Sequence, residues 1–132
     1  MAGGIVPVAK ALYLCDFHVG YSNGKLDLYG IFNAIRATSF PHRKGPFVCF
    51  AQLLGGVGNV SFHIDVRRGT NRQLVDWSGT RTLHFPNRNT LLQVAVTLPG
   101  CVFDQPGIYL VELYCDNTWV ADTTVQLLGP KP

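Results

Sequence analysis

Residues 59–68 read NVSFHIDVRR, and apolar and polar side chains alternate through the stretch. Successive side chains of a β-strand point to opposite faces, so this period of two predicts a strand with one buried face. Val60, Phe62, Ile64 and Val66 are expected to point inward and the residues between them outward. Such a half-buried strand is typical of an antiparallel sheet.

Further strands are predicted on both sides of this segment. With it, they lie at 8 to about 22, 25–35, 47–54, 59–68, 73–77, 80–85, 90–98, 108–115 and 119–127. No segment has the 3.6-residue period of an amphipathic helix. The sequence therefore predicts an all-β fold, a two-sheet antiparallel β-sandwich of the immunoglobulin-like kind with about 7–9 strands.

Turn residues separate these strands. Asn23-Gly24 predicts a tight hairpin, and the glycine-rich residues 55–58 predict a turn rather than a phosphate-binding loop. Gly30, inside a predicted strand, indicates a bulge or a close crossing of two backbones. Residues 36–46 and 99–107 are expected to be connections without strands.

The length of 132 residues predicts one domain over 1–132, with flexible tails at 1–7 and 129–132. A 47% apolar content excludes general disorder, and a net charge of +3 is low for a dedicated nucleic-acid binder. Neither a signal peptide nor a membrane span is recognisable. The four widely spaced cysteines are expected to be reduced thiols, which favours the cytoplasm.

Three short motifs resemble a known family. Pro106-Gly107-Ile108-Tyr109 opens a predicted strand, as in immunoglobulin-like sandwiches, where the tyrosine packs inward and its hydroxyl caps nearby backbone. With Cys15-Asp16 and Gly30-Ile31-Phe32, the chain resembles a short uncharacterised bacterial family of immunoglobulin-like β-sandwich proteins of unknown function. The resemblance implies a bacterial origin and a sandwich fold, and it implies no activity.

Candidate catalytic groups are few. His63 and Asp65 share a strand face, but a zinc site needs at least one more protein ligand. A solvated sheet face explains both residues more simply, so a small metal-dependent hydrolase is the least favoured hypothesis. Cys101 is predicted to be the one exposed thiol, while the other cysteines lie in apolar strands. We therefore expect the protein to have no catalytic residue and to bind no metal or cofactor. It is predicted not to be an enzyme.

Two surfaces are candidates for binding. The first is basic: if the loops at 36–44 and 67–72 converge, they would attract nucleic acid or an acidic glycan. The second is apolar, because strands 108–115 and 119–127 look apolar on both faces and a partner could cover one of them. The candidate residues are Arg36, Arg43, Lys44, Arg67 and Arg68 for the first, and Leu110, Tyr114 and Trp119 for the second, with Tyr13 and Tyr29 as possible additions.

The function predicted is a non-enzymatic interaction module that associates with a protein partner or with itself as a homo-oligomer. The alternative is a binding domain for an anionic polymer through loops 36–44 and 67–72. Nucleic acid is the less favoured partner at this low net charge, and no membrane association is expected.

Overall fold

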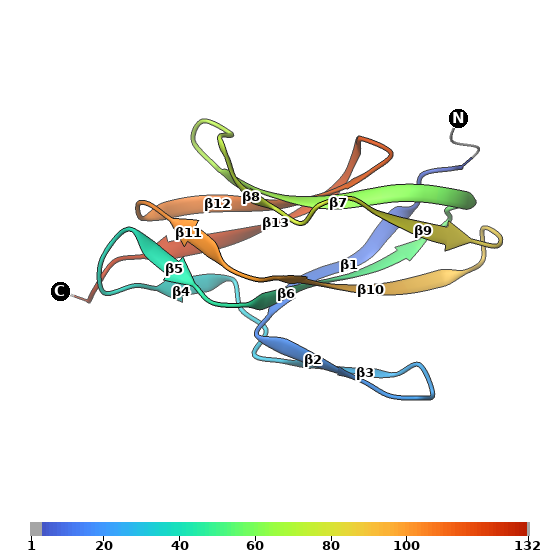
Figure 1. Ribbon diagram of the computed structural model, residues 1–132, viewed down its shortest axis with the longest axis horizontal. Helices are drawn as coiled ribbons and strands as arrows, with labels where there is room; N and C mark the ends of the chain where they lie inside the picture. The colour runs from blue at the N-terminus through green and yellow to red at the C-terminus, as the bar shows by residue number, and fades with distance from the viewer. Residues whose placement is uncertain (1–3, 132) are drawn as a thin grey trace.

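The computed structural model describes residues 4–131, which form thirteen β-strands and no helix (Figure 1). This part of the chain therefore has no helix that could cross a membrane. The all-β prediction is confirmed. The strands are β1 (Val8–Cys15), β2 (Phe17–Gly20), β3 (Leu26–Tyr29), β4 (Ala34–Arg36), β5 (His42–Lys44), β6 (Phe47–Leu54), β7 (Gly58–Arg68), β8 (Leu74–Trp77), β9 (Arg81–Phe85), β10 (Leu91–Leu98), β11 (Cys101–Phe103), β12 (Gly107–Cys115) and β13 (Thr118–Leu128).

The main sheet has six strands in the order β4-β13-β12-β7-β8, with β9 also paired to β7. It is mixed, because β4 runs parallel to β13, and it curls into a half-barrel (Figure 1). The prediction of an immunoglobulin-like sandwich with about 7–9 strands is corrected here. The topology is not clearly immunoglobulin-like, since small extra sheets surround the main one.

The smaller sheets are β1-β6-β10, β5-β11 and β2-β3. One hydrophobic core lies between the main sheet and β1-β6-β10, and it includes Phe47 and Leu53 from β6 and Phe62 from β7. Val60, Phe62, Ile64 and Val66 are all buried in it, as their alternation predicted. The core therefore joins the sheets into one unit.

The hairpin of β12 and β13 follows the local sequence closely. Asp116 and Asn117 both have positive φ, 49° and 60°, which suits a tight turn between β12 and β13. Tyr109 at the start of β12 is buried, and its hydroxyl donates a hydrogen bond to the Gln105 carbonyl oxygen at 2.7 Å. The inward packing and backbone capping expected of this tyrosine are both confirmed.

Two predicted strands are each divided in the structure. The first breaks at Asp16, whose amide donates to the carbonyl oxygens of Tyr29 and Gly30 at 2.9 and 3.2 Å. The second breaks at Gly30, where φ is +69° and the Asp16 side chain occupies the space a Cβ would need. Gly30 is thus the close crossing that the sequence indicated. Beyond it, β2 and β3 leave the body as a separate hairpin, residues 17–29, which we call the arm (Figure 1).

Short strands also replace the two connections expected at 36–46 and 99–107. In the first, His42–Lys44 forms β5, and in the second Cys101–Phe103 forms β11. These strands pair with each other, Cys101 opposite Lys44 and Phe103 opposite His42. Strands of three residues are too short to show a period in the sequence, so the prediction missed them.

Part of the predicted tails lies outside the described residues, namely 1–3 and 132. Near the N-terminus, Ile5 exchanges backbone hydrogen bonds with Val57 at 2.8 and 3.1 Å. Near the C-terminus, the Gly129 carbonyl oxygen accepts a hydrogen bond from Arg36 Nη1 at 2.6 Å.

Candidate functional site

The outer face of the main sheet gathers most of the polar and aromatic candidates. The register places Tyr114 opposite His63 and Glu112 opposite Asp65 on adjacent strands β12 and β7. Residues directly opposite each other in an antiparallel pair point to the same face. We call this surface the ionic face; it comprises His63, Asp65, Arg67, Arg72, Trp77, Leu110, Glu112, Tyr114 and Trp119.

Two carboxylates are almost fully buried at its centre. Asp65 is 6% exposed and Glu112 2% exposed. Arg67 Nη2 donates to Asp65 Oδ2 at 2.8 Å, and Arg72 Nη2 donates to both Glu112 oxygens at 2.8 and 2.9 Å. A buried carboxylate is tolerated only when it is paired and hydrogen-bonded, and both acids meet this condition.

A hydroxyl and a third ion pair complete the network. The Tyr114 hydroxyl donates to Glu112 Oε1 at 3.1 Å, and burial together with this hydrogen bond raises the pKa of Tyr114. Arg67 Nε lies 3.3 Å from the same oxygen but at an angle that makes no hydrogen bond. Hydrogen bonding to Glu112 raises the pKa of Arg72, so its guanidinium stays charged. These contacts fix the side chains before any ligand arrives.

An aromatic row crosses the same face. The His63 ring stacks on Tyr114 at 5.0 Å with an interplanar angle of 6°, and Trp77 meets His63 edge-on at 6.2 Å. Trp119 lies opposite Tyr114 on β13. Trp77 is 52% exposed and Trp119 53% exposed. Four rings on four adjacent strands therefore form a row with an open tryptophan at each end.

Metal-binding geometry is not found on this face. Among residues 4–131, no group of three histidine, cysteine or acidic side chains is placed to hold a metal ion. His63 Nε2 is 3.6 Å from Asp65 Oδ1, and the next charged neighbour of Asp65 is Arg67 rather than a further ligand. The metal-dependent hydrolase hypothesis gains no support from this arrangement.

The cysteines are all buried, which corrects the prediction for Cys101. Its side chain lies inside the fold on β11, and burial, with a smaller contribution from Asp76, raises its pKa to about 12. Burial likewise raises the pKa of Cys49 to about 12 and of Cys115 to about 11, and it raises that of Cys15. At neutral pH these thiols are protonated, which makes them poor nucleophiles.

Four of the five basic candidate residues lie against acidic or backbone partners. Lys44 pairs with Asp16 at 3.3 Å beside the base of the arm, while Arg67 pairs with Asp65 on the ionic face. Arg68 forms an ion pair with Asp104. Arg36 binds a backbone carbonyl near the C-terminus, and Arg43 is exposed on β5. Lys44 and Arg67 thus belong to different sheets, and their charges are already compensated.

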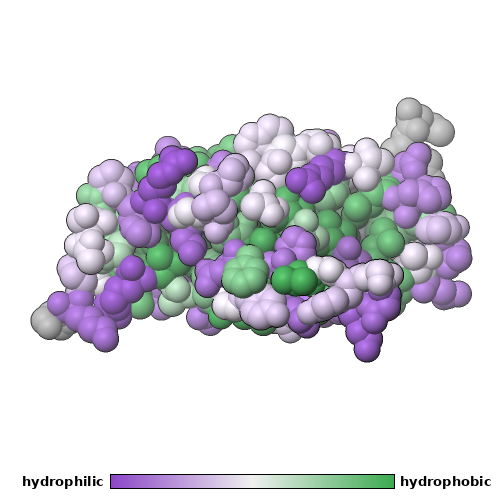
Figure 2. All heavy atoms as spheres, turned by 60° about the horizontal axis from the view of Figure 1, so that its bottom comes forward, coloured by the Kyte–Doolittle hydropathy of each residue, from purple (hydrophilic) through white to green (hydrophobic). Residues whose placement is uncertain are grey.

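The arm carries a second, apolar surface. Phe17 and Tyr29 stack at 4.7 Å with an interplanar angle of 11°, although they are 54% and 42% exposed. Val19 is exposed beside them on β2, and Tyr13 and Ile31 are exposed at the base. Figure 2 views the molecule from this side and shows hydrophobic residues at the surface among polar ones. The sequence singled out only Tyr13 and Tyr29, because residue 17 was expected to continue the first strand.

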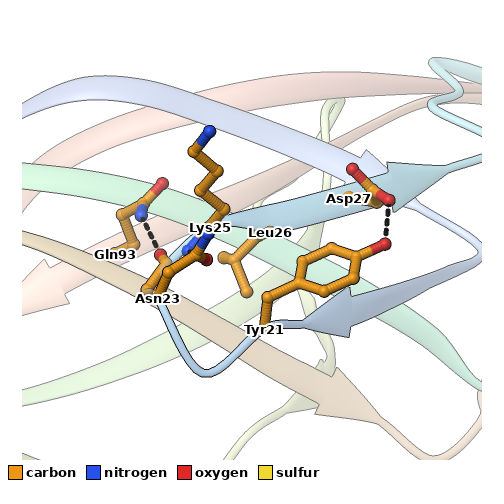
Figure 3. Close-up of a pocket in the computed structure, with 7 residues that line it drawn as sticks. Tyr21, Asn23, Lys25, Leu26, Asp27 and Gln93 are labelled. Carbon is orange, nitrogen blue, oxygen red and sulfur yellow. Dashed lines mark hydrogen bonds between the residues drawn. The ribbon is translucent and has the colours of Figure 1, made fainter.

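A hollow of about 610 Å³ lies where the tip of the arm meets β10 (Figure 3). Its polar groups bind one another. Gln93 Nε2 donates to the Gly24 carbonyl oxygen at 3.2 Å, and the Tyr21 hydroxyl donates to Asp27. Asn23 Oδ1 accepts from the Lys25 amide at 3.0 Å. The Gln93–Gly24 bond joins the tip of the arm to β10, and the other two bonds lie within the arm.

Residues 10–127, from β1 to β13, match a protein family that is described as "Family of unknown function (DUF6941)". The chain belongs to the DUF6941 family. The expected likeness to a family of unknown function is thereby confirmed, whereas the DUF6941 description mentions neither an immunoglobulin-like fold nor a bacterial source. No curated protein matches the sequence significantly. Both the ionic face and the arm lie within the DUF6941 match.

Proposed function

We propose that the protein is a non-enzymatic interaction module that self-associates through the arm. The observation that carries the proposal is the exposed stack of Phe17 on Tyr29, with Val19 also exposed on the arm and Tyr13 and Ile31 exposed at its base. The four cysteines are free and buried, which supports a reducing compartment such as the cytoplasm.

The size of the apolar surface supports association. An aromatic side chain offers roughly 150–250 Å², so three half-exposed aromatic rings with a valine and an isoleucine present on the order of 400 Å². A patch of this size is close to the largest on a typical monomer and is often functional. Aromatic residues are also enriched at the centres of interfaces.

The backbone of the arm supports a second copy as the occupant. In the described residues, β2 and β3 pair only with each other, so each keeps one free edge. A two-stranded hairpin is marginal by itself and gains stability from a further strand. A second copy offers both an identical free edge and an identical apolar surface, which allows symmetric pairing.

Sedimentation equilibrium from low to high micromolar concentration tests this proposal. The wild-type protein is expected to form a dimer or higher oligomer, and the double variant Phe17→Ser with Tyr29→Ser to be a monomer. Trp77→Ser, on the opposite ionic face, is the matched control and should associate as the wild type does. A wild-type protein that stays monomeric at high micromolar concentration, or a double variant that still associates, contradicts the proposal.

The alternative, binding of an anionic polymer, has less support. Lys44, Arg67 and Arg68 each lie against a carboxylate, so an incoming phosphate or sulfate would have to displace it. Salt-sensitive retention on single-stranded DNA or heparin would favour this alternative, since displaced counterions make such binding depend on ionic strength.

A further inference from the structure

We infer that the ionic face is a binding site for an uncharged sugar chain, with Trp77 and Trp119 as stacking platforms and the ionic network between them as the hydrogen-bonding centre. The observation behind it is the aromatic row over the buried carboxylates. It does not depend on the arm, which lies on the opposite side of the molecule (Figure 1).

The spacing of the tryptophans fits an elongated ligand. Trp77 is on β8 and Trp119 on β13, with β7 and β12 between them. Adjacent strands are about 4.8 Å apart, so the two platforms are separated by roughly 14 Å across the sheet. In Figure 1 the β7–β8 turn and the β12–β13 turn both rise from this side of the sheet. A short oligosaccharide lying across the strands would span both rings.

The charge of the face favours an uncharged ligand. Asp65 and Glu112 are paired with Arg67 and Arg72, and Asp122, opposite Glu112 on β13, adds one exposed carboxylate. These three carboxylates and two guanidinium groups give the face a slight negative charge, which repels phosphate or sulfate polymers. A cationic ligand would find both central carboxylates already occupied by guanidinium groups.

The chemistry of the face is amphipathic in the way that a sugar ring is. A pyranose has an apolar C–H face, which packs on an aromatic ring, and a rim of hydroxyl groups that both donate and accept hydrogen bonds. Arg72 is half exposed, and a guanidinium has five N–H groups, so some remain for a ligand after Glu112 is bound. Tyr114 and His63 add polar atoms beside it.

The polar side chains of the ionic face are already held in place without a ligand. Asp65, Glu112 and Tyr114 are held by the network described above, and His63 is held by stacking. A ligand would therefore lose less free energy to the ordering of side chains than on a face of mobile residues. A purely apolar partner would have to cover the ionic centre without hydrogen bonds, which is costly.

Affinity electrophoresis in native gels tests the inference. The probes are soluble uncharged polysaccharides, namely xylan, glucomannan, hydroxyethyl cellulose and amylose, with single-stranded DNA as a separate arm. The wild-type protein is expected to be retarded by at least one polysaccharide, and Trp77→Ala and Trp119→Ala are each expected to weaken the binding about tenfold. Phe17→Ser, on the arm, is the matched control and should bind as the wild type does.

Three results would overturn the inference: no retardation by any polysaccharide, equal binding by the tryptophan variants and the wild type, or retention by the DNA alone. Both tryptophan side chains are half exposed, so their loss should leave the fold intact, which circular dichroism would verify. Tyr114→Phe sharpens the test, because it keeps the stacked ring and removes the hydroxyl, and a several-fold weaker binding is expected. Since the arm variants report on self-association, failure here leaves the proposed function standing.

Discussion

The ionic face and the arm both expose aromatic side chains, but they do so on different foundations. On the ionic face, the rings lie on a six-stranded sheet above the core, and the two central ones, His63 and Tyr114, lie against buried carboxylates. On the arm, Phe17 and Tyr29 lie on two strands that pair only with each other among the described residues. The exposed fraction of an aromatic side chain therefore does not tell whether the side chain contributes to the stability of the fold or to binding.

This difference separates two kinds of energetic effect. Changes at the centre of the ionic face should cost folding free energy, because they leave buried charges unpaired. Substitutions on the outside of the arm should weaken self-association but change the free energy of unfolding little, because those side chains are exposed to solvent. Four substitutions or conditions test this division.

Glu112→Ala is expected to have the largest effect. It removes the carboxylate shared by Arg67, Arg72 and the Tyr114 hydroxyl, and loss of one member of a buried ion pair costs about 3–5 kcal/mol. Asp122→Ala, opposite it on β13 and exposed, is the control and should change stability by less than about 0.5 kcal/mol. Urea unfolding measures both. If Glu112→Ala and Asp122→Ala lower the free energy of unfolding by equally small amounts, the ion pairs of the ionic face do not stabilise the fold.

Alkaline pH should weaken the core that supports both regions. Burial raises the pKa of Cys49 and Cys101 to about 12 and of Cys115 to about 11, above the ordinary 9.0. These thiols stay protonated in the folded chain but ionise in the unfolded chain above pH 9, so the stability present below pH 9 is lost as the pH rises. Each should cost about 1 kcal/mol between pH 9 and pH 10.

Urea unfolding at pH 8 and pH 10 measures this loss, which over the two pH units is expected to be about 4 kcal/mol for the three thiols together. Cys49→Ala provides the control: whatever its stability at each pH, the difference between the two pH values should shrink by about one third. A wild-type stability that is the same at pH 8 and pH 10 contradicts the burial of the thiols.

Gly30→Ala tests the base of the arm. The residue has a positive φ, and the Asp16 side chain fills the position of the new methyl group, so a loss of about 1–2 kcal/mol is expected. At Gly45 nothing lies within 4 Å of an added Cβ, so Gly45→Ala should be close to neutral. Unfolding in urea compares the two, and limited proteolysis should cut within 17–29 sooner in Gly30→Ala. Equal stability would show that the arm is not fixed at this crossing.

Phe17→Ser is expected to have the smallest effect on stability. It removes one stacked ring from the exposed side of the arm, a loss below about 1 kcal/mol. Phe62→Ser, at a buried position of β7, should cost about 3–5 kcal/mol by comparison. Thermal unfolding distinguishes them. A large loss for Phe17→Ser would mean that the arm's outer side is part of the core after all.

The features that were predicted correctly depend on local patterns in the sequence. The alternation from Val60 to Val66 predicted the buried side of β7, because side-chain direction in a strand depends only on position along the chain. Asn23-Gly24 predicted a hairpin for a similar reason, since the turn is decided by a few adjacent φ and ψ angles.

The features that the sequence did not predict depend on contacts between residues far apart in the chain. Asp65 looked like an ordinary outward residue, yet Arg67 beside it and Glu112 from β12 bury it. Gly30 marked a crossing, but only the folded chain shows that Asp16 is its partner and that the arm departs there. The sequence by itself determined the all-β fold, the approximate place of the longer strands and the buried face of β7. Tertiary structure alone decided where strands break, which charges pair and which aromatic rings stay exposed, because those outcomes depend on packing between residues far apart in the chain.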